Sequence, residues 1–450
     1  MSTLSELERD FSRDGIGASW ADGQPSTWNS DTSCLTLSKA CITGSISSDE
    51  GLLAILITGA IAIASLDTVT INQTIELEGA ENATHNYHLE WQPDRQYALL
   101  FSTPDLTTLY HLDRTTLTVV ASHRLDNRAV PSLTSTAFNP SGTMLVLQHK
   151  PDPPAEPHFE VWTTTDTVPT LHATLDTAYT STNTAATSWH PTAPLLAFST
   201  LSSTIPTPST SSAPAPAPEE TASPDPPLHI WDITTNNNPR PLAPPPQHRH
   251  RRHQPWRHAF SPCGTYIALS AGTHGLIWHA ASGSLLADVR IAPAWWARCV
   301  PAWQPSASSK STAAYAEPPR VAFGGAGGAV TVVRLRARGG EEKVQAVVEQ
   351  ERRGRGQGQQ QGGGTMEVLA GEVGGVEWVD EGKGLVFDTG RDGGVEVWHR
   401  ERNVKWRMEQ PVGEQQEKRK KGVVTRWCEG RRMVVVLDRE VGVVRFRRMP

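Results

Sequence analysis

The sequence has few cysteines, and none of them form the pairs that staple a domain or hold a metal. Its five cysteines, Cys34, Cys41, Cys263, Cys299 and Cys428, are odd in number, widely scattered and contain no C-x-x-C pair. This usage favours reduced thiols over a disulfide framework or a zinc site. We therefore expect an intracellular protein, in the cytoplasm, the nucleus or both, with no metal and no cofactor.

Long apolar runs are also missing. The longest, residues 52–63, is interrupted by Thr58 and Gly59. It is shorter than the roughly 18–20 residues that a membrane-spanning helix needs. The N-terminus has acidic residues where a secretory signal would carry a basic start and an apolar stretch. We expect neither a membrane-spanning helix nor an export signal.

The motifs of common catalytic sites are absent as well. The sequence contains no G-x-S-x-G, no H-E-x-x-H and no G-x-x-x-x-G-K-[ST]. The glycine-rich segment 324–328 lies between two apolar stretches without a helix behind it to face a phosphate. It therefore predicts a tight turn, and the sequence as a whole argues against an enzyme.

Neither sign of charge dominates overall, but the two ends of the chain differ. Residues 1–130 hold seven basic and seventeen acidic residues, whereas residues 400–450 hold fifteen basic and seven acidic ones. Opposite charges attract over distances up to about 10 Å in physiological salt. A fold that brings the two ends together is therefore favoured.

One sequence unit occurs eight times. Each copy has an alternating strand, a polar turn, a second apolar strand, a short turn and a third strand that ends near an aromatic residue. The residue that ends the first strand is called the key residue here. The eight key residues are Ile46, Trp91, Phe138, Trp189, Phe260, Trp303, Trp378 and Trp427.

The spacing of the key residues indicates the architecture. Successive key residues are 45, 47, 51, 71, 43, 75 and 49 residues apart. The two long intervals contain low-complexity insertions, and without them every interval is about 45–50 residues, the length of a propeller blade. A second aromatic residue follows four of the key residues after 19, 18, 20 and 19 residues. The period predicts an all-β fold, a single β-propeller of four-stranded antiparallel blades.

Two copies carry motifs of a known family. Residues 228–232 read Leu-His-Ile-Trp-Asp, and residues 260–264 read Phe-Ser-Pro-Cys-Gly. Over residues 32–448 the chain resembles the WD-repeat β-propellers, a likeness that is specific for fold and uninformative for function. Recurrence at the repeat period assigns four tryptophans to structure, and the resemblance implies structural roles for two aspartates as well. These are Trp162, Trp231, Asp232, Trp278, Asp392 and Trp398.

The sequence departs from the family in lacking the Gly-His pair before the first strand of each repeat. The resemblance then implies that the family's Asp-His-Ser-Trp hydrogen-bond network is mostly absent. Blade stability would depend on apolar packing and strand pairing.

The ends of the chain suggest how the ring closes. The last copy stops at its third strand, and because sheet edges need protection, we expect residues 32–38 to supply its fourth strand. Eight copies then give eight blades, with seven, the commoner number in the family, as the alternative. The predicted domains are an N-terminal arm at 1–31, which either lies outside the ring or binds a partner, and a propeller at 32–450.

Three segments inside the propeller lack the apolar residues needed for packing. They are about 202–227, 306–318 and 352–365. We predict disordered insertions there, either tolerated loops or sites of recruitment.

Two groups of basic residues lie in predicted loops, and each has a functional interpretation and a purely structural one. A candidate nucleic-acid patch consists of Arg249, Arg251, Arg252, Arg352, Arg353 and Arg355. A candidate nuclear-import signal consists of Lys418, Arg419, Lys420 and Lys421. Both groups are also typical of solvated loops. The histidines at 248, 250, 253 and 258 have only Cys263 nearby as a further ligand and arginines among them, so we expect no metal there.

A rigid ring with variable loops is typical of a binding scaffold. We expect a non-catalytic scaffold for protein–protein interactions, a monomeric propeller within a multi-subunit complex. The alternative is an RNA-associated propeller that binds through the basic loop patch. An enzyme would need converging carboxylates, such as Asp49, Asp94 and Asp380, or a central metal. The candidate partner anchors are Trp256, Trp295 and Trp296, which could equally pack between blades.

Overall fold

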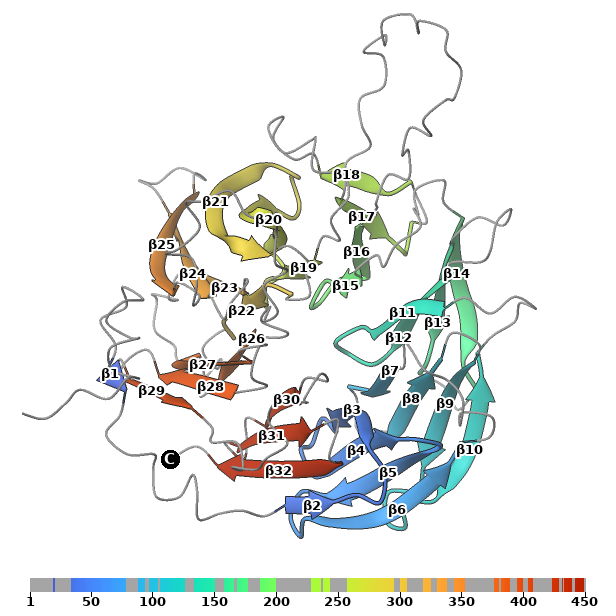
Figure 1. The fold of residues 1–450 in the computed structure, drawn as a ribbon. Coiled ribbons are helices and arrows are strands. Elements are labelled where there is room, and N and C mark those ends of the chain that lie inside the picture. Colours follow the sequence, from blue (N-terminus) through green and yellow to red (C-terminus); the bar gives the residue numbers. More distant parts are fainter. Residues whose placement is uncertain are drawn as a thin grey trace, which may run out of the picture.

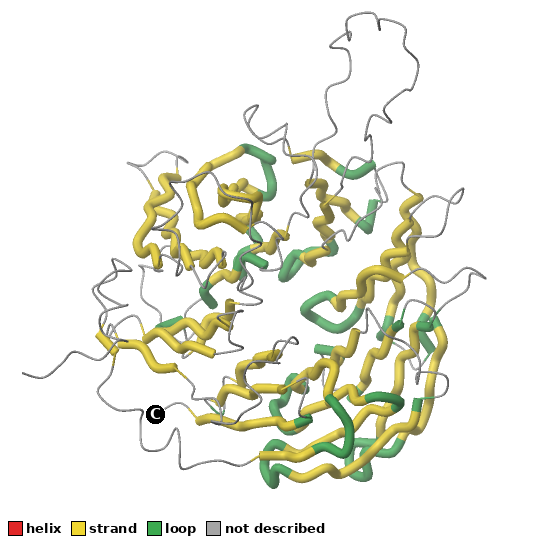
Figure 2. Tube along the Cα trace, viewed as in Figure 1, coloured by secondary structure: helices red, strands yellow, loops and turns green. Residues whose placement is uncertain are grey.

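The fold consists of strands arranged as a ring of sheets. A computed structural model of the chain describes residues 19–20, 34–77, 88–93, 97–103, 106–125, 133–149, 158–165, 168–176, 187–199, 228–235, 238–242, 257–294, 300–305, 319–324, 330–337, 344–352, 376–379, 382–388, 395–399, 404–407, 423–428, 431, 433–438 and 442–448. These residues contain strands and no helix (Figure 2), so nothing in this part of the chain is a helix long and apolar enough to cross a membrane. Eight sheets surround a centre (Figure 1).

Each sheet is one blade, numbered here in chain order. Blade 1 is β3 (Cys41–Ile46), β4 (Leu52–Ile57), β5 (Ala60–Ser65) and β6 (Thr70–Glu76). Blade 2 is β7 (His88–Trp91), β8 (Ala98–Ser102), β9 (Thr107–Leu112) and β10 (Val119–Arg124). Blade 3 is β11 (Leu133–Phe138), β12 (Met144–His149), β13 (His158–Thr163) and β14 (Thr170–Asp176). Blade 4 is β15 (Thr187–Trp189), β16 (Leu195–Ser199), β17 (Leu228–Asp232) and β18 (Arg240–Leu242).

The second half of the chain builds the remaining blades. Blade 5 is β19 (Arg257–Phe260), β20 (Tyr266–His279) and β21 (Leu285–Ala294). Blade 6 is β22 (Ala302–Trp303), β23 (Arg320–Gly324), β24 (Val330–Ala337) and β25 (Val344–Arg352). Blade 7 is β26 (Val376–Val379), β27 (Gly384–Asp388), β28 (Val395–His399) and β29 (Val404–Arg407). Blade 8 is β30 (Val423–Cys428), β31 (Met433–Asp438), β32 (Val443–Arg448) and β2 (Cys34–Thr36).

Every blade runs outward from the centre of the ring. The first strands lie near the middle and the last strands lie outside (Figure 1), and first strands of neighbouring blades contact each other, as β3 does with β7 and β30. Apolar side chains fill the space between blades; one cluster joins Leu53 and Ile55 of blade 1 to Val435 and Leu437 of blade 8. The core is therefore a series of interfaces between adjacent sheets.

The longest apolar run in the sequence becomes a buried hairpin. Residues of β4 and β5 are all buried, and Gly59, with φ 78°, forms the turn between them. Both strands are apolar on each face because each face packs against a neighbouring blade, which removes the polar alternation of a half-exposed strand.

Blade 5 has three strands where the others have at least four, because β20 combines two of them. The backbone N–H of Ala280 donates to the carbonyl of Thr265 at 2.8 Å, so the two ends of the 14-residue β20 lie side by side. The first part of β20 pairs with β19 and the second with β21. The four-stranded blade plan is thus kept.

The ends of the chain meet as the sequence predicts. β2 pairs antiparallel with β32, with Cys34 opposite Arg445 and Thr36 opposite Val443. The eight-bladed propeller closed by an N-terminal strand is confirmed, and the seven-bladed alternative is wrong. A further strand, β1 (Ser19–Trp20), pairs in parallel with β29 at the outer edge of blade 7.

Candidate functional site

The key tryptophans tie the inner strands of the ring together. In four blades the indole Nε1–H donates a hydrogen bond to the preceding blade's inner strand, at the residue just before that blade's key residue. The donor and acceptor pairs are Trp91 with Ser45 (3.1 Å), Trp189 with Ala137 (2.9 Å), Trp303 with Ala259 (2.9 Å) and Trp378 with Ala302 (2.8 Å). The repeated aromatic residue therefore links blades as well as filling the core.

The residue after the key residue caps its own turn in blades 1, 3 and 5. Its side-chain oxygen accepts a hydrogen bond from the backbone N–H five residues later. The capping residues are Ser47 (3.0 Å), Asn139 (2.9 Å) and Ser261 (3.0 Å). In these three blades a side chain of the turn itself therefore caps the first turn.

In blades 2, 4 and 6 the same position reaches into the next blade. Gln92 Nε2 donates to the carbonyl of Gly142 at 2.6 Å, and Gln304 Nε2 donates to that of Gly382 at 3.2 Å. In blade 4, His190 lies so close to Gly264 that a Cβ there would be 2.1 Å from its Nε2. The residue after the key residue therefore contacts its own turn in blades 1, 3 and 5 and the next blade's turn in blades 2, 4 and 6.

The seam between blade 8 and blade 1 follows this plan with different residues. Glu50, with φ 56°, takes the place of the turn glycines, and Arg431 Nε donates to its carbonyl at 2.7 Å. Cys428, which follows its key residue, donates its Sγ–H to Glu50 Oε2 at 3.1 Å. Burial, with Glu50 beside it, raises the pKa of Cys428 to about 12, so the thiol keeps the proton it donates. Arg431 Nη1 also pairs with Asp67 at 2.7 Å, which joins the basic end of the chain to the acidic one.

All four tryptophans assigned to structure lie buried in the third strands of their blades. They are Trp162, Trp231, Trp278 and Trp398. The Nε1 atoms of Trp231 and Trp398 have no hydrogen-bond partner among the described residues. Asp232 accepts hydrogen bonds from the Thr234 hydroxyl (2.7 Å) and backbone N–H (3.0 Å), and these bonds, the hydroxyl's foremost, hold its pKa below the usual range. In this copy the Trp-Asp dipeptide supplies a buried ring and a turn cap.

Most of the other candidate residues lie outside the described part of the chain. These are Asp392, Trp256, Trp295, Trp296, Arg249, Arg251, Arg252, Arg353, Arg355, Lys418, Arg419, Lys420 and Lys421. The same holds for residues 202–227, 306–318 and 353–365, and for the predicted arm apart from β1. The backbone of Arg352 ends β25.

Two further residues, considered in the sequence analysis as a possible catalytic carboxylate and a possible metal ligand, take part in hydrogen bonds of the fold. Asp49 accepts hydrogen bonds from Ser47 (2.7 Å), the Gly51 N–H (3.1 Å) and the Tyr97 hydroxyl. Burial alone would raise the pKa of Asp49, but these bonds outweigh it and lower the pKa. His258 Nε2 lies 3.1 Å from the carbonyl of Ala197 in blade 4, so its ring spans two blades. Both side chains are explained by the fold.

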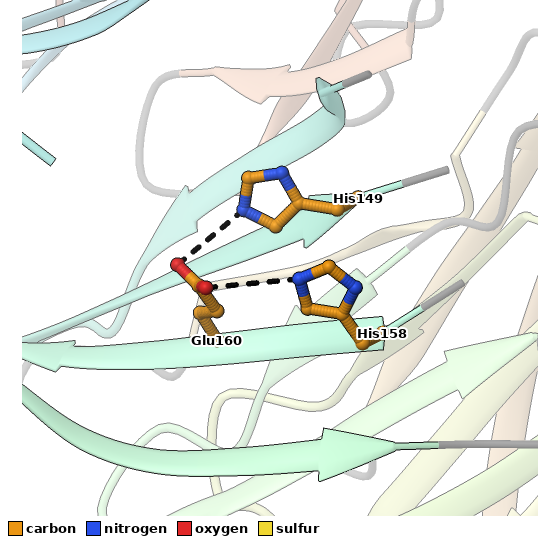
Figure 3. A group of neighbouring side chains, drawn as sticks. All are labelled: His149, His158 and Glu160. Carbon is orange, nitrogen blue, oxygen red and sulfur yellow. Dashed lines mark ion pairs between the residues drawn. The ribbon is translucent and has the colours of Figure 1, made fainter. Parts of the chain in front are cut away.

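Sequence reasoning missed one group of ionisable side chains. His149 ends β12, His158 begins β13, and Glu160 follows two residues later, all three buried in blade 3 (Figure 3). The two histidines face each other across the β12–β13 ladder, and alternation along β13 puts Glu160 on the face of His158. The available signal in the sequence was a histidine at the end of one predicted strand, His149, followed by His-x-Glu at the start of the next, residues 158–160.

The geometry of this group is unusual for a buried cluster. Glu160 Oε2 lies 3.5 Å from His149 Nε2, and Oε1 lies 3.6 Å from His158 Nε2. The imidazole rings stack with centroids 4.8 Å apart and planes 13° apart. Burial alone would raise the pKa of Glu160, but the two histidines and Trp162 more than offset it, so the pKa lies well below its usual range. The cluster thus holds a buried carboxylate in its ionised form.

The outer wall of the first three blades exposes aliphatic side chains. The second residue of each outer strand is Ile71 in β6 (42% exposed), Val120 in β10 (64%) and Leu171 in β14 (45%). Val119 and Val168 beside them are also exposed. We call these five residues the outer-wall row. Scattered single apolar residues on a surface are ordinary, but exposed ones recur near the start of three consecutive outer strands, which makes this row a candidate interaction surface.

Comparison with known proteins agrees with this architecture. No protein-family model and no curated protein matches the sequence. The crystal structure of Chaetomium thermophilum Sqt1 bound to the N-terminus of the ribosomal protein L10 is similar, with 14% identity over 91% of this chain and 97% of that chain and a TM-score of 0.58. Saccharomyces cerevisiae Sqt1 has 10% identity over 93% and 98%, with a TM-score of 0.56. The WD40 domain of SCAP from fission yeast has 7% identity over 95% and 96%, with a TM-score of 0.55.

At these identities the likeness is one of fold. Together with the eight sheets, it defines the class: the chain is an eight-bladed β-propeller, similar in fold to propellers that include a WD40 domain. The similar structures include a propeller crystallised with a segment of another protein.

Proposed function

We propose that this protein is a non-catalytic scaffold that mediates protein–protein interactions within a multi-subunit complex, and that the outer-wall row is one of its docking surfaces. The observation that carries the proposal is the recurrence of exposed Ile71, Val120 and Leu171 at the start of three consecutive outer strands. When a partner covers such apolar side chains and removes them from water, the complex is stabilised by about 25 cal/mol per Å² of apolar surface buried.

The strands that bear the row also offer their edges. Among the described strands, β6, β10 and β14 each end their sheet, so their outer backbone groups face no further strand. In blade 7 the equivalent edge of β29 is paired by β1. An outer edge of this ring therefore accepts an added strand, and the partner that suits the row is an extended protein segment with apolar side chains.

Two further observations support the proposal. A propeller of the same fold, Sqt1 from Chaetomium thermophilum, has been crystallised with the N-terminus of a ribosomal protein. Cys34, Cys41, Cys263 and Cys428 form no disulfide in the described part of the chain, which suits a complex inside the cell, in the cytoplasm, the nucleus or both.

The test compares two variants of one strand. Val120→Asp places a charge in the row, whereas Ser122→Asp places the same charge at another exposed position of β10, two residues along. Tagged wild type and both variants are purified from the native cells with nuclease and about 0.5 M salt, and co-eluting proteins are quantified by mass spectrometry.

We expect a stoichiometric set of proteins that the wild type and Ser122→Asp retain and that Val120→Asp loses by roughly tenfold or more. A set that both variants retain would overturn the docking surface. Loss of the set on nuclease treatment of the wild type would favour the RNA-associated alternative over the protein scaffold.

A further inference from the structure

We propose that His149, His158 and Glu160 bind a divalent transition-metal ion, with Zn²⁺ as the best match. The site lies at one end of the β12–β13 hairpin in blade 3 (Figure 3) and is independent of the outer-wall row. Two imidazoles and one carboxylate are a ligand set that Zn²⁺ uses when it keeps its fourth position open.

The spacing of the donor atoms suits an ion better than hydrogen bonds. Ligands at the usual Zn²⁺ distances of about 2.0–2.1 Å lie roughly 3.3 Å from one another around a tetrahedron. The Glu160 oxygens lie 3.5 Å and 3.6 Å from the histidine nitrogens, and all three ligand atoms lie within 4.8 Å of one another. These separations exceed the usual hydrogen-bond range of about 2.7–3.2 Å. The stacked rings, whose planes are 13° apart, would have to turn toward each other so that both Nε2 lone pairs point at one ion.

Burial leaves the histidine nitrogens in need of a partner. His149 Nε2 and His158 Nε2 are buried and make only the 3.5 Å and 3.6 Å ion-pair contacts with Glu160, and His158 Nδ1 has no hydrogen-bond partner among the described residues. Unmatched buried polar atoms are costly, and native structures seldom keep several in one place without a reason. A metal ion would engage one nitrogen of each ring and neutralise the buried carboxylate in the same step.

The surrounding structure fixes the ligands and leaves an approach. Trp162 Nε1 donates to Glu160 Oε2 at 3.1 Å, the kind of outer hydrogen bond that orients a ligating carboxylate. The side chain of His149 is 10% exposed, against 5% for His158 and 3% for Glu160. An ion would enter from the His149 side, and water would complete its coordination there.

The experiment uses full-length protein stripped of metal with a chelator. Zn²⁺ binding is measured by calorimetry, and Co²⁺ binding by visible absorption, in which a four- or five-coordinate ion gives an intense ligand-field band. We expect one ion per chain and displacement of Co²⁺ by Zn²⁺. Glu160→Gln and His158→Gln should each weaken Zn²⁺ binding about tenfold or more.

Two controls make the result specific to this site. His274→Gln removes a histidine from a two-residue pair with Asp288 (2.8 Å) and should leave Zn²⁺ affinity unchanged. A variant with His248, His250 and His253 changed to Gln should also bind one ion, because these residues are not ligands of the site.

Absence of metal binding by the wild type, or equal affinity in Glu160→Gln, His158→Gln and the His274→Gln control, would overturn the proposal. If the two ligand variants do not fold by circular dichroism, the Co²⁺ spectrum of the variant lacking His248, His250 and His253 decides. An intense ligand-field band from a four- or five-coordinate Co²⁺ ion upholds the site, and the weak spectrum of hydrated Co²⁺ overturns it.

Discussion

Glu50 occupies a backbone conformation that three other blades give to glycine. Its φ is 56°, and the residues at the same place in the first turn of blades 3, 5 and 7 are Gly142 (φ 70°), Gly264 (φ 74°) and Gly382 (φ 82°). A side chain in this region is strained. At the closing seam the strain is offset by contacts that a glycine could not make, above all the hydrogen bond from Cys428 to the Glu50 carboxylate.

The turn glycines lead to a prediction about stability. Gly264→Ala places a Cβ at positive φ and against the ring of His190, so we expect it to lower the free energy of unfolding by about 1–3 kcal/mol. Gly51→Ala is the matched control, because Gly51 is not at positive φ and a Cβ there meets nothing closer than 3.4 Å. We expect that control to change stability by about 0.5 kcal/mol or less.

Chemical denaturation monitored by tryptophan fluorescence measures both variants. Equal stability for Gly264→Ala and Gly51→Ala would show that His190 and the backbone of residue 264 do not constrain the turn as described.

At this scale the sequence predicted the turns better than the site. Phe-Ser-Pro-Cys-Gly marks a turn because glycine accepts positive φ, and the structure has it there. The group of His149, His158 and Glu160 escaped notice because its members come from two strands, and only the pairing register brings them together. The loop with histidines 248, 250 and 253 drew attention instead, since its residues are close in sequence.

Between elements, the hydrogen bond from a key tryptophan to the preceding inner strand is the feature that recurs most often. The indole N–H of Trp189 has a partner in the carbonyl of Ala137, whereas that of Trp231 in the same blade has none among the described residues. The two rings are otherwise alike, since both are buried. Comparing substitutions of these two tryptophans therefore separates the contribution of the buried ring to stability from the contribution of its hydrogen bond.

We expect Trp189→Phe to destabilise the protein by about 1 kcal/mol more than Trp231→Phe, because only the first change leaves a carbonyl without its donor. Midpoints and slopes of urea unfolding measure the difference. A larger loss for Trp231→Phe would contradict the idea that the key tryptophans hold neighbouring blades together.

The period of the sequence was sufficient to place the strands, but not their connections. Eight key residues at a blade-length spacing marked eight first strands, and each lies in the predicted strand. The contacts between neighbouring first turns were not apparent, although Gln92, His190 and Gln304 follow tryptophan at the same position. Without coordinates, nothing indicated that these side chains act across a blade boundary.

For the whole molecule, contacts at the first turns link neighbouring blades at several places in the ring. Ser47, Asn139 and Ser261 cap their own turns, while Gln92 and Gln304 reach the next blade. Blade 8 completes the series by contacting blade 1 through Cys428 and Arg431. Opposite charges also favour closing the ring here, because the Arg431–Asp67 ion pair joins the basic C-terminal part of the chain to the acidic N-terminal part.

The central claim is that the chain forms one closed ring in which β2 completes blade 8. Cys34 lies directly opposite Arg445 in that pairing, so Arg445→Cys creates a cross-strand cysteine pair. Val443→Cys is the control, because Val443 lies opposite Thr36 and the diagonal distance to Cys34, about 7–8 Å, is too long for a disulfide.

The decisive measurement is peptide mass spectrometry of the two variants after mild oxidation. We predict a disulfide between Cys34 and the new cysteine in nearly all molecules of Arg445→Cys, and little or none between Cys34 and the new cysteine of Val443→Cys. Failure of the first variant to cross-link, or equal cross-linking in both, would contradict the closure of the ring by β2.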